Sequence, residues 1–261
     1  MRVPQLFDLK GKVALVTGGG RGLGKFIATG LAEAGADLAL ASRKIQNCQK
    51  VAEDLRKLGV RASAFPCDVA KVEDLENLVQ ATLNTYGRID ILVNNSGMTW
   101  GAPTLEYPLD KWERTMAVNV RSVFLLSQKA AKIMISQKGG KIINIASTQG
   151  FRGADEDIHP ALAYNASKGA VVTLTKDLAI KLARYNIQVN AIAPGYFATD
   201  MLTWLEEDRY KSAKEKIYGL IPMNRMGREE DIKGLGVFLA SAASNFITGD
   251  IILVDGGQLA R

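Results

Sequence analysis

Tyr164 and Lys168 form a pair whose residue types and spacing suggest acid–base chemistry. They stand four positions apart at the start of a helical pattern, so a helix would carry both on one face. A phenol with its ordinary pKa near 10 exchanges protons poorly at neutral pH, but a nearby ammonium stabilises the phenolate and lowers that pKa. Ser147 follows a predicted strand and could donate a hydrogen bond to a carbonyl oxygen beside Tyr164. Such pairs also occur on helices by chance, so the prediction depends on where the fold places them.

A glycine-rich segment, Thr17–Gly24, joins the first predicted strand to the first predicted helix. Its glycines allow the backbone to approach a phosphate, and the helix N-terminus supplies free N–H groups and positive potential. Gly18, Gly22 and Gly24 follow a GxxxGxG spacing rather than GxGxxG. Glycines in such turns are often present only because the backbone needs a positive φ there. The position of this segment between a strand and a helix nevertheless favours dinucleotide binding.

The same stretch offers a second interpretation, a nucleotide triphosphatase, because Gly19 to Lys25 reads GxxxxGK. The next residue is Phe26, whereas a triphosphatase needs a Ser or Thr hydroxyl there to hold Mg²⁺. The sequence therefore disfavours this interpretation.

The end of the second predicted strand indicates which dinucleotide the turn would bind. An NAD site usually has an acidic residue there that accepts from the ribose 2′-hydroxyl. Here the segment contains Ser42, Arg43 and Lys44 with no acid, and Arg21 in the glycine turn adds a cation. Guanidinium groups bind phosphate in a bidentate manner, so the cluster favours NADP(H) over NAD(H). The alternative is that these are solvated charges at the start of a helix.

Strand-like and helix-like segments alternate along the chain. The runs typical of strands are 13–17, 38–42, 62–66, 89–94, 141–146, 188–193 and 251–254. The stretches with helical periodicity are 23–34, 46–58, 72–86, 111–135, 163–184 and 230–240. Continuously apolar strands indicate a sheet covered on both faces, and the alternation implies parallel strands with right-handed crossovers. We expect one doubly wound α/β domain over residues 1–261.

Two segments interrupt this alternation. Residues 150–160 are polar and irregular, and residues 196–220 contain a helical stretch rich in aromatic and charged residues. Both could be binding loops or ordinary surface excursions. His159 in the first segment is more typical of a solvated residue than of a catalyst, although it could contact substrate. Trp100 and Trp204 could wall the pocket or serve in packing or oligomer contacts.

The composition excludes several classes of protein. The 261 residues include 47% hydrophobic and 23% charged residues, as in globular proteins. No apolar run approaches the roughly 20 residues that cross a bilayer, and the first residues do not read as a signal peptide, so we expect a cytoplasmic protein. One histidine and two unpaired cysteines make a metal site unexpected. The net charge of +6 contains no basic run, which fits a small polyanionic ligand better than nucleic acid.

Together these motifs resemble the short-chain dehydrogenase/reductase family over nearly the whole chain. The segments that carry the resemblance are Thr17–Gly24, Asp68-Val69, Asn94–Gly97, Asn119, Ser147, Tyr164 with Lys168, Pro194-Gly195 and 254–257. Each is common alone, but all of them in this order are specific. The resemblance implies a seven-stranded parallel sheet in the order 3-2-1-4-5-6-7, helices on both faces, and a homotetramer.

The resemblance also implies roles for individual residues. Tyr164 exchanges the proton with the substrate oxygen, and Lys168 lowers the Tyr164 pKa and bonds the nicotinamide ribose. Ser147 polarises the carbonyl, and Asn119 supports a water-linked proton relay. The residues expected to contact NADP(H) are Gly18, Gly20, Arg21, Gly22, Leu23, Gly24, Ser42, Arg43, Lys44, Asp68, Val69, Asn95, Ser96, Gly97, Tyr164, Lys168, Pro194, Gly195 and Thr199. No metal takes part directly in this chemistry.

Two departures from the family pattern concern the site. Ser96 replaces the usual alanine, a small change that should be tolerated. The interval from Ser147 to Tyr164 is longer than is common in the family, with the extra length in 152–160. This leaves the substrate open but not the reaction type, provided that the loop bulges outward and preserves the Ser147–Tyr164 contact.

Within the family, residues 7–24, 39–44 and 221–257 are similar to gluconate 5-dehydrogenase-type enzymes. We therefore expect hydride transfer between NADP(H) and a secondary alcohol or ketone. The alternative is a 3-oxoacyl-[acyl-carrier-protein] reductase, because the two subgroups share most motifs. A non-catalytic nucleotide-binding protein is disfavoured by the complete Asn119, Ser147, Tyr164 and Lys168 set, and a serine hydrolase by the lack of GxSxG.

Overall fold

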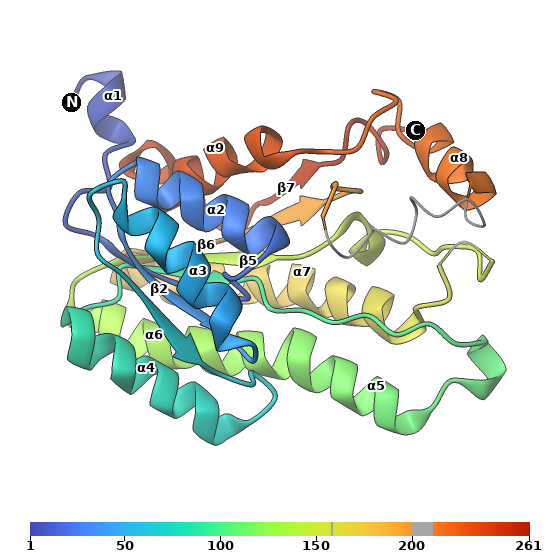
Figure 1. Cartoon of the computed structure of the whole chain (residues 1–261), viewed down its shortest axis with the longest axis horizontal. Helices are drawn as coiled ribbons and strands as arrows, with labels where there is room; N and C mark the ends of the chain where they lie inside the picture. The colour runs from blue at the N-terminus through green and yellow to red at the C-terminus, as the bar shows by residue number, and fades with distance from the viewer. Residues whose placement is uncertain (158, 200–210) are drawn as a thin grey trace.

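The computed structural model describes residues 1–157, 159–199 and 211–261, which are built around a parallel β-sheet (Figure 1). In this part of the chain, seven strands follow the order β3-β2-β1-β4-β5-β6-β7. Their bounds are β1 Val13–Thr17, β2 Asp37–Ser42, β3 Ala62–Pro66, β4 Ile91–Asn94, β5 Gly140–Ile145, β6 Ile187–Pro194 and β7 Ile251–Val254. The predicted fold class and strand order are confirmed, and every predicted strand lies within two residues of its expected limits.

Helices cover both faces of the sheet. Their bounds in the described residues are α1 Val3–Leu6, α2 Gly22–Glu33, α3 Ile45–Arg56, α4 Val72–Tyr86, α5 Leu109–Met116, α6 Ser122–Ser136, α7 Leu162–Leu182, α8 Lys211–Gly219 and α9 Glu229–Ala240. Figure 1 shows α2, α3 and α9 on one face and α4, α5, α6 and α7 on the other. Among these helices, none is both long and apolar enough to span a bilayer.

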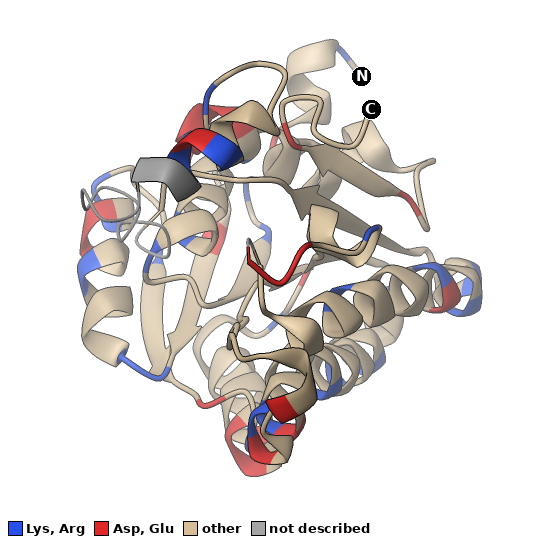
Figure 2. Ribbon diagram, turned by 90° about the vertical axis from the view of Figure 1, so that its right-hand side faces the viewer, with Lys and Arg blue, Asp and Glu red and all other residues tan. Residues whose placement is uncertain are grey.

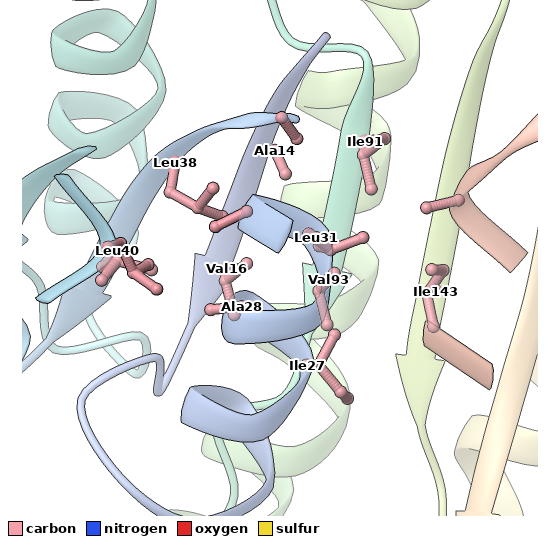
Figure 3. Close-up of a cluster of buried hydrophobic side chains, with 14 of the residues drawn as sticks. Ala14, Val16, Ile27, Ala28, Leu31, Leu38, Leu40, Ile91, Val93 and Ile143 are labelled. Carbon is pink, nitrogen blue, oxygen red and sulfur yellow. The ribbon is translucent and has the colours of Figure 1, made fainter. Parts of the chain in front are cut away.

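Alternate residues of the central strand pack against opposite helical layers. Ala14 and Val16 belong to a buried cluster with Ile27 of α2 (Figure 3). Val13 and Leu15 belong to the cluster on the other face, which α4 and α6 cover. All five residues of β1 are buried, and this burial on both faces explains the uninterrupted apolar run in the sequence.

The predicted helix over 111–135 is divided by a wider turn. Helix α5 ends at Met116, a π-helical turn spans Ala117–Arg121, and α6 begins at Ser122. Periodicity close to 3.6 residues does not reveal a single π turn, and such turns frequently occur at functional sites. This one places Asn119, a predicted site residue, at its centre.

The strand order reverses between β1 and β4, because the chain passes from β1 to β2 on one side while β4 pairs with β1 on the other. In doubly wound folds, ligands bind outside the carboxyl ends of the strands at this point. The glycine-rich segment follows β1, Asn95 follows β4 and Ser147 follows β5 by two residues. The topology therefore brings the predicted site residues to one edge of the sheet.

Candidate active site

Ser147, Tyr164 and Lys168 come together at the carboxyl end of β5. Helix α7 begins at Leu162, so Tyr164 lies in its first turn and Lys168 one turn further on. The Lys168 Nζ lies 5.5 Å from the centroid of the Tyr164 ring. The Ser147 hydroxyl is within hydrogen-bonding reach of the Tyr164 phenol. The predicted contact between Ser147 and Tyr164 is therefore preserved despite the longer interval between them.

Burial shifts both titratable groups toward their neutral forms. It raises the pKa of Tyr164, an effect that the Ser147 hydroxyl opposes and the nearby Tyr196 phenol increases. It also lowers the pKa of Lys168 to about 8. The Lys168 ammonium donates to the Ile145 carbonyl at 2.7 Å, and burial is the main influence on the pKa of Tyr164 in this arrangement, so the lowering of that pKa by Lys168 stays a prediction. Tyr164 is therefore a protonated acid at neutral pH.

Asn119 is buried in the π turn and anchors the loop that follows β4. Its Oδ1 accepts from the Met98 N–H at 2.9 Å, and its Nδ2 donates to the Met98 carbonyl at 2.9 Å. The same Nδ2 donates to the Ser167 Oγ of α7. A Cβ built on Gly97 would lie 3.6 Å from the Asn119 Oδ1 and 3.8 Å from the Lys168 Nζ. Asn119 and Lys168 thus both face Gly97, while the relay role of Asn119 remains a prediction.

The glycine-rich turn is shaped so closely by its neighbours that side chains would not fit. A Cβ on Gly24 would collide with the Gly18 carbonyl and the Asn95 amide. Gly18 and Gly22 have φ values of +67° and +51°, which side chains rarely adopt. A Cβ on Gly20 would lie 2.9 Å from the first turn of α3, at the Cys48 backbone nitrogen. These four glycines form the backbone cradle that a dinucleotide phosphate requires.

Asn95 and Thr17 fasten the loop after β4 to the glycine turn. The Asn95 Nδ2 donates to the Thr17 carbonyl at 2.9 Å and to the Gly18 carbonyl at 3.3 Å. The Thr17 Oγ1 accepts from the backbone N–H groups of Asn95 and Ser96, both at 3.0 Å. Because the Ser96 contact uses the backbone, serine is accommodated where the family usually has alanine. Gly97 follows at the surface.

The cations that favour NADP(H) lie at the surface and form no ion pair within the described part of the chain. Arg21, Arg43 and Lys44 are exposed, and the ion pairs of the described residues include none of them. The Ser42 Oγ donates to the Lys44 carbonyl at 2.8 Å and thereby fixes the turn that carries both cations. Unpaired cations next to a glycine cradle fit a 2′-phosphate, whereas a 2′-hydroxyl would require an acceptor.

Asp68 and Val69 occupy the loop after β3. Burial opposes ionisation of Asp68, but the Arg114 guanidinium 2.6 Å away, the Ala70 N–H and Arg43 together hold its pKa below the usual value. Asp68 is therefore an ionised acceptor. Val69 is buried in the core cluster beneath it.

The remaining predicted cofactor residues lie around the same edge. Leu23 is half-buried and packs against the core under α2. A Cβ on Gly22 would lie 3.5 Å from the Thr199 side chain, so the loop after β6 reaches the glycine turn. Pro194 ends β6, and the Gly195 N–H donates to the Val254 carbonyl at 2.9 Å. The structure thus brings together both halves of the predicted site, although contact with NADP(H) remains a prediction for each residue.

The 150–160 segment lies over the active site and is held at two points. The Thr104 N–H donates to the Glu156 carboxylate at 2.7 Å, and the Ala102 N–H donates to the Pro160 carbonyl at 2.9 Å. Its acidic residues form a continuous stretch of loop in Figure 2. A hollow of about 310 Å³ lies between these acidic residues and Lys216 of α8.

Several residues at the site escaped sequence analysis. The Gln149 N–H donates to the Ser147 Oγ at 3.2 Å, and the Gln149 side chain is within hydrogen-bonding reach of Tyr196. The His159 ring meets the Tyr164 ring edge-on, with centroids 5.8 Å apart, so the interpretation of His159 as a solvated loop residue is wrong. The only signal for Gln149 and Tyr196 was their position just after β5 and β6.

The two tryptophans singled out in the sequence have different outcomes. Trp100 is partly exposed, and the Lys111 Nζ lies 4.9 Å from the centroid of one of its rings on the surface beside α5. Trp204 lies outside the described residues, as do the other residues from 200 to 210.

Comparison with known proteins agrees with this geometry. The family model described as Enoyl-(Acyl carrier protein) reductase matches residues 18–258. A 5-keto-D-gluconate 5-reductase from Escherichia coli (strain K12) is 41% identical over 254 residues, which cover 97% of this chain and 98% of that protein. A 2-dehydro-3-deoxy-D-gluconate 5-dehydrogenase from the same strain is 43% identical over 256 residues, 98% of each chain. A solved gluconate 5-dehydrogenase from Burkholderia cenocepacia J2315, in complex with NADP and tartrate, has a TM-score of 0.92 and 37% identity over 100% of both chains.

The chain therefore belongs to the short-chain dehydrogenase/reductase family, as its motifs predicted. Within that family it is an NAD(P)-dependent oxidoreductase that acts on CH–OH groups. It is similar to gluconate 5-dehydrogenases and related reductases over its whole length.

Proposed function

We propose that this enzyme interconverts a keto sugar acid and the corresponding secondary alcohol, such as 5-keto-D-gluconate and D-gluconate, with NADP(H). The observation that carries the proposal is the grouping of Ser147, Tyr164 and Lys168 beside a glycine cradle flanked by unpaired cations. The full-length similarity to a 5-keto-D-gluconate 5-reductase and to an NADP-bound gluconate 5-dehydrogenase supports the substrate class and the cofactor.

The residues present fit NADP(H) at both ends of the molecule. Gly18, Gly22 and Gly24 would admit the pyrophosphate, and Arg21 and Arg43 would bind the 2′-phosphate. Lys168 would bond the nicotinamide ribose, and the nicotinamide, when bound, supplies or accepts the hydride.

The side chains of the site donate a proton and a hydrogen bond to the substrate oxygen as it gains charge. In ketone reduction, the carbonyl oxygen gains negative charge, and Tyr164 transfers its phenolic proton to that oxygen. The Ser147 Oγ already accepts from the Gln149 N–H, which leaves its own hydroxyl proton free to donate to the same oxygen. Lys168 places a positive charge next to the phenol that has lost its proton. In alcohol oxidation the same groups act in reverse.

A second candidate is a reductase of 3-oxoacyl thioesters carried on acyl carrier protein. The family model that matches residues 18–258 is described as Enoyl-(Acyl carrier protein) reductase, which favours a substrate carried on acyl carrier protein, although an enoyl group is reduced at a C=C bond and not at a ketone. Both candidates use the same Tyr164 chemistry and differ only in the substrate.

A substrate screen distinguishes the two candidates. NADPH oxidation is followed at 340 nm with 5-keto-D-gluconate, a 3-oxoacyl thioester and simple diketones, and each assay is repeated with NADH. We expect turnover of the sugar acid with a preference for NADPH. Selective turnover of the thioester would replace the lead proposal with the alternative, and a preference for NADH would contradict the proposed cofactor.

We also propose that the enzyme is a cytoplasmic homotetramer of one-domain subunits. A groove of about 790 Å³ on the α5–α6 side is lined largely by apolar side chains, among them Trp112, Met116 and Phe124. At the sheet edge, Leu253 of β7 and Phe246 are exposed. Two apolar surfaces on different elements support two kinds of subunit contact. Light scattering after size exclusion should give four times the chain mass of 28.2 kDa, and a monomer would contradict the proposal.

A further inference from the structure

Unsatisfied polar atoms gather around the active site. In the described part of the chain, eight buried side-chain nitrogen or oxygen atoms have no hydrogen-bond partner. Four of them lie between residues 149 and 165, and they are the Gln149 Oε1, Arg152 Nε, His159 Nε2 and Asn165 Oδ1. Buried polar groups are normally paired, so such a concentration calls for an explanation. A polar ligand that binds in the active site and hydrogen-bonds these atoms would explain it.

These four residues surround the reacting tyrosine. His159 contacts the Tyr164 ring edge-on, and Asn165, which follows Tyr164 in the sequence, lies close enough to His159 to interact with it. The Gln149 Oε1 and the Arg152 Nε are therefore the two atoms of this group with the greatest need of a partner. Gln149 touches Ser147 through its backbone N–H. Arg152 lies close to both His159 and Tyr196. Burial is the main cause of the lowered pKa of His159, and the Arg152 charge lowers it further. Burial raises the pKa of Tyr196, and the Arg152 charge opposes that rise. A substrate oriented by Tyr164 and Ser147 would therefore contact this group.

Arg152 is the charged member of the group, and its own loop does not neutralise it. Asp155, Glu156 and Asp157 follow it closely, yet the ion pairs of the described residues include none with Arg152. Glu156 is instead occupied by the Thr104 N–H and hydroxyl. Arg152 is half-buried with its Nε inaccessible to water, so this guanidinium beside the active site has no anionic partner among the described residues.

We propose that Arg152 binds the carboxylate of the substrate, while Gln149 and His159 hydrogen-bond its hydroxyl groups. Guanidinium and carboxylate match in a bidentate geometry that lysine cannot reproduce. In a six-carbon 5-keto acid, four C–C bonds of about 1.5 Å separate the carboxylate carbon from the reacting carbon, so both ends must be bound within one small region. This inference rests on the proposed function and makes the 150–160 segment the determinant of specificity for sugar acids.

The test compares two ketones that differ at one group. L-Sorbose carries CH₂OH where 5-keto-D-gluconate carries its carboxylate, with the same ketone and hydroxyl pattern. Arg152→Gln should reduce kcat/KM for the keto acid about 10- to 100-fold, mainly through KM, and change that for L-sorbose less than about threefold. The kcat/KM of Arg152→Lys for the keto acid should lie between those of wild type and Arg152→Gln, because lysine keeps the positive charge but cannot form the bidentate hydrogen bonds of a guanidinium. Arg184→Gln removes an exposed arginine in the short turn that follows α7 and should leave both values unchanged.

Equal losses on both ketones, or no loss on the keto acid, would overturn the assignment of Arg152. A binding measurement keeps the two proposals separable. Titration calorimetry of the NADP⁺ complex should show that wild type binds D-gluconate more tightly than D-glucitol, its uncharged alcohol, and that Arg152→Gln abolishes this difference. If wild type turns over neither ketone, the proposed function fails, whereas an Arg152-dependent preference for D-gluconate would still establish the carboxylate site. The absence of that preference would refute it.

Discussion

Tyr164 and Lys168 share an environment in which burial opposes ionisation of both. For ketone reduction this is a suitable resting state, because the phenol holds a proton that it can donate. The charged form of Lys168 becomes most useful once that proton has left, since an ammonium near the phenolate stabilises it. The residue types and the four-residue spacing identified this pair from sequence, whereas the direction of the pKa shift depends on burial, which no local pattern contains.

The pH dependence of reduction should reflect Lys168. With its pKa lowered to about 8, the ammonium is present at pH 7 and lost at higher pH, while the raised pKa of Tyr164 keeps the phenol protonated. We therefore expect kcat/KM for ketone reduction to be constant from pH 6.5 to about 7.5 and to fall above about pH 8. Rates measured with saturating NADPH across this range test the expectation, and a profile that stays level to pH 10 would contradict it.

A buried lysine outside the site provides the control for that profile. Lys141 at the start of β5 also has its pKa lowered to about 8 by burial. The Lys141→Met variant should retain the alkaline fall in activity. Loss of the fall in this variant would assign the titration to the wrong lysine.

Arg43 should determine the choice of nicotinamide cofactor. The side chain is exposed and unpaired among the described residues, and replacing it removes charge-assisted hydrogen bonds to a 2′-phosphate. Arg43→Ala should raise the KM for NADPH about 10- to 100-fold and leave that for NADH within about threefold. Lys50→Ala, which changes an exposed cation further along α3, should alter neither. Equal effects of Arg43→Ala on both cofactors would reject the 2′-phosphate role.

At the scale of elements, sequence patterns located the strands and most helices because burial on both faces leaves clear apolar runs. They missed the π turn around Asn119, whose geometry depends on tertiary contacts with Met98 and Ser167. They also left the 150–160 segment open, because a polar loop with no periodicity gives no sign that His159 will pack on Tyr164. The parts that could not be predicted are those fixed by contacts distant in the sequence.

Two helical glycines should respond in opposite ways to the same substitution. In Gly24→Ala the new methyl group would meet the Gly18 carbonyl and the Asn95 amide, so it should destabilise the protein by about 1–3 kcal/mol and weaken NADPH binding. Gly234 lies in α9 with nothing within 4 Å of a Cβ. Gly234→Ala should therefore stabilise the protein by up to about 1 kcal/mol. Thermal unfolding measures both, and a neutral Gly24→Ala would contradict the close packing of the glycine cradle.

Lys141 should reduce stability at neutral pH. Below pH 8 the buried side chain carries a charge, and among the described residues its ammonium donates a hydrogen bond to the Ser244 hydroxyl at 3.3 Å and forms no ion pair. Between pH 8 and 10.5 the unfolded chain binds the proton more tightly than the folded one, so this cost decreases as pH rises. Lys141→Met should raise the free energy of unfolding by about 3 kcal/mol at pH 7 and by much less at pH 10.5. Denaturant unfolding of wild type and variant at pH 7 and pH 10.5 tests this. An increase in unfolding free energy of the same size at both pH values would contradict it.

At the scale of the whole molecule, the topology collects chemistry from distant parts of the sequence. Segments after β1, β4, β5 and β6 all reach the carboxyl edge of one sheet, which explains how residues from Gly18 to Thr199 share a site. The net charge of +6 fits this arrangement, since three of the cations lie unpaired beside the glycine cradle. The strand order followed from the family resemblance, and the alternating segments alone indicated only a parallel doubly wound sheet.

The most direct test of the account is the turnover of a Tyr164→Phe variant with its affinity for NADPH measured alongside. The account assigns the proton of the reaction to one phenol whose removal leaves the glycine cradle intact. NADPH oxidation with 5-keto-D-gluconate should fall about 10²- to 10⁴-fold, while the Kd for NADPH from fluorescence titration stays within about threefold of wild type. Turnover within tenfold of wild type would show that another group supplies the proton.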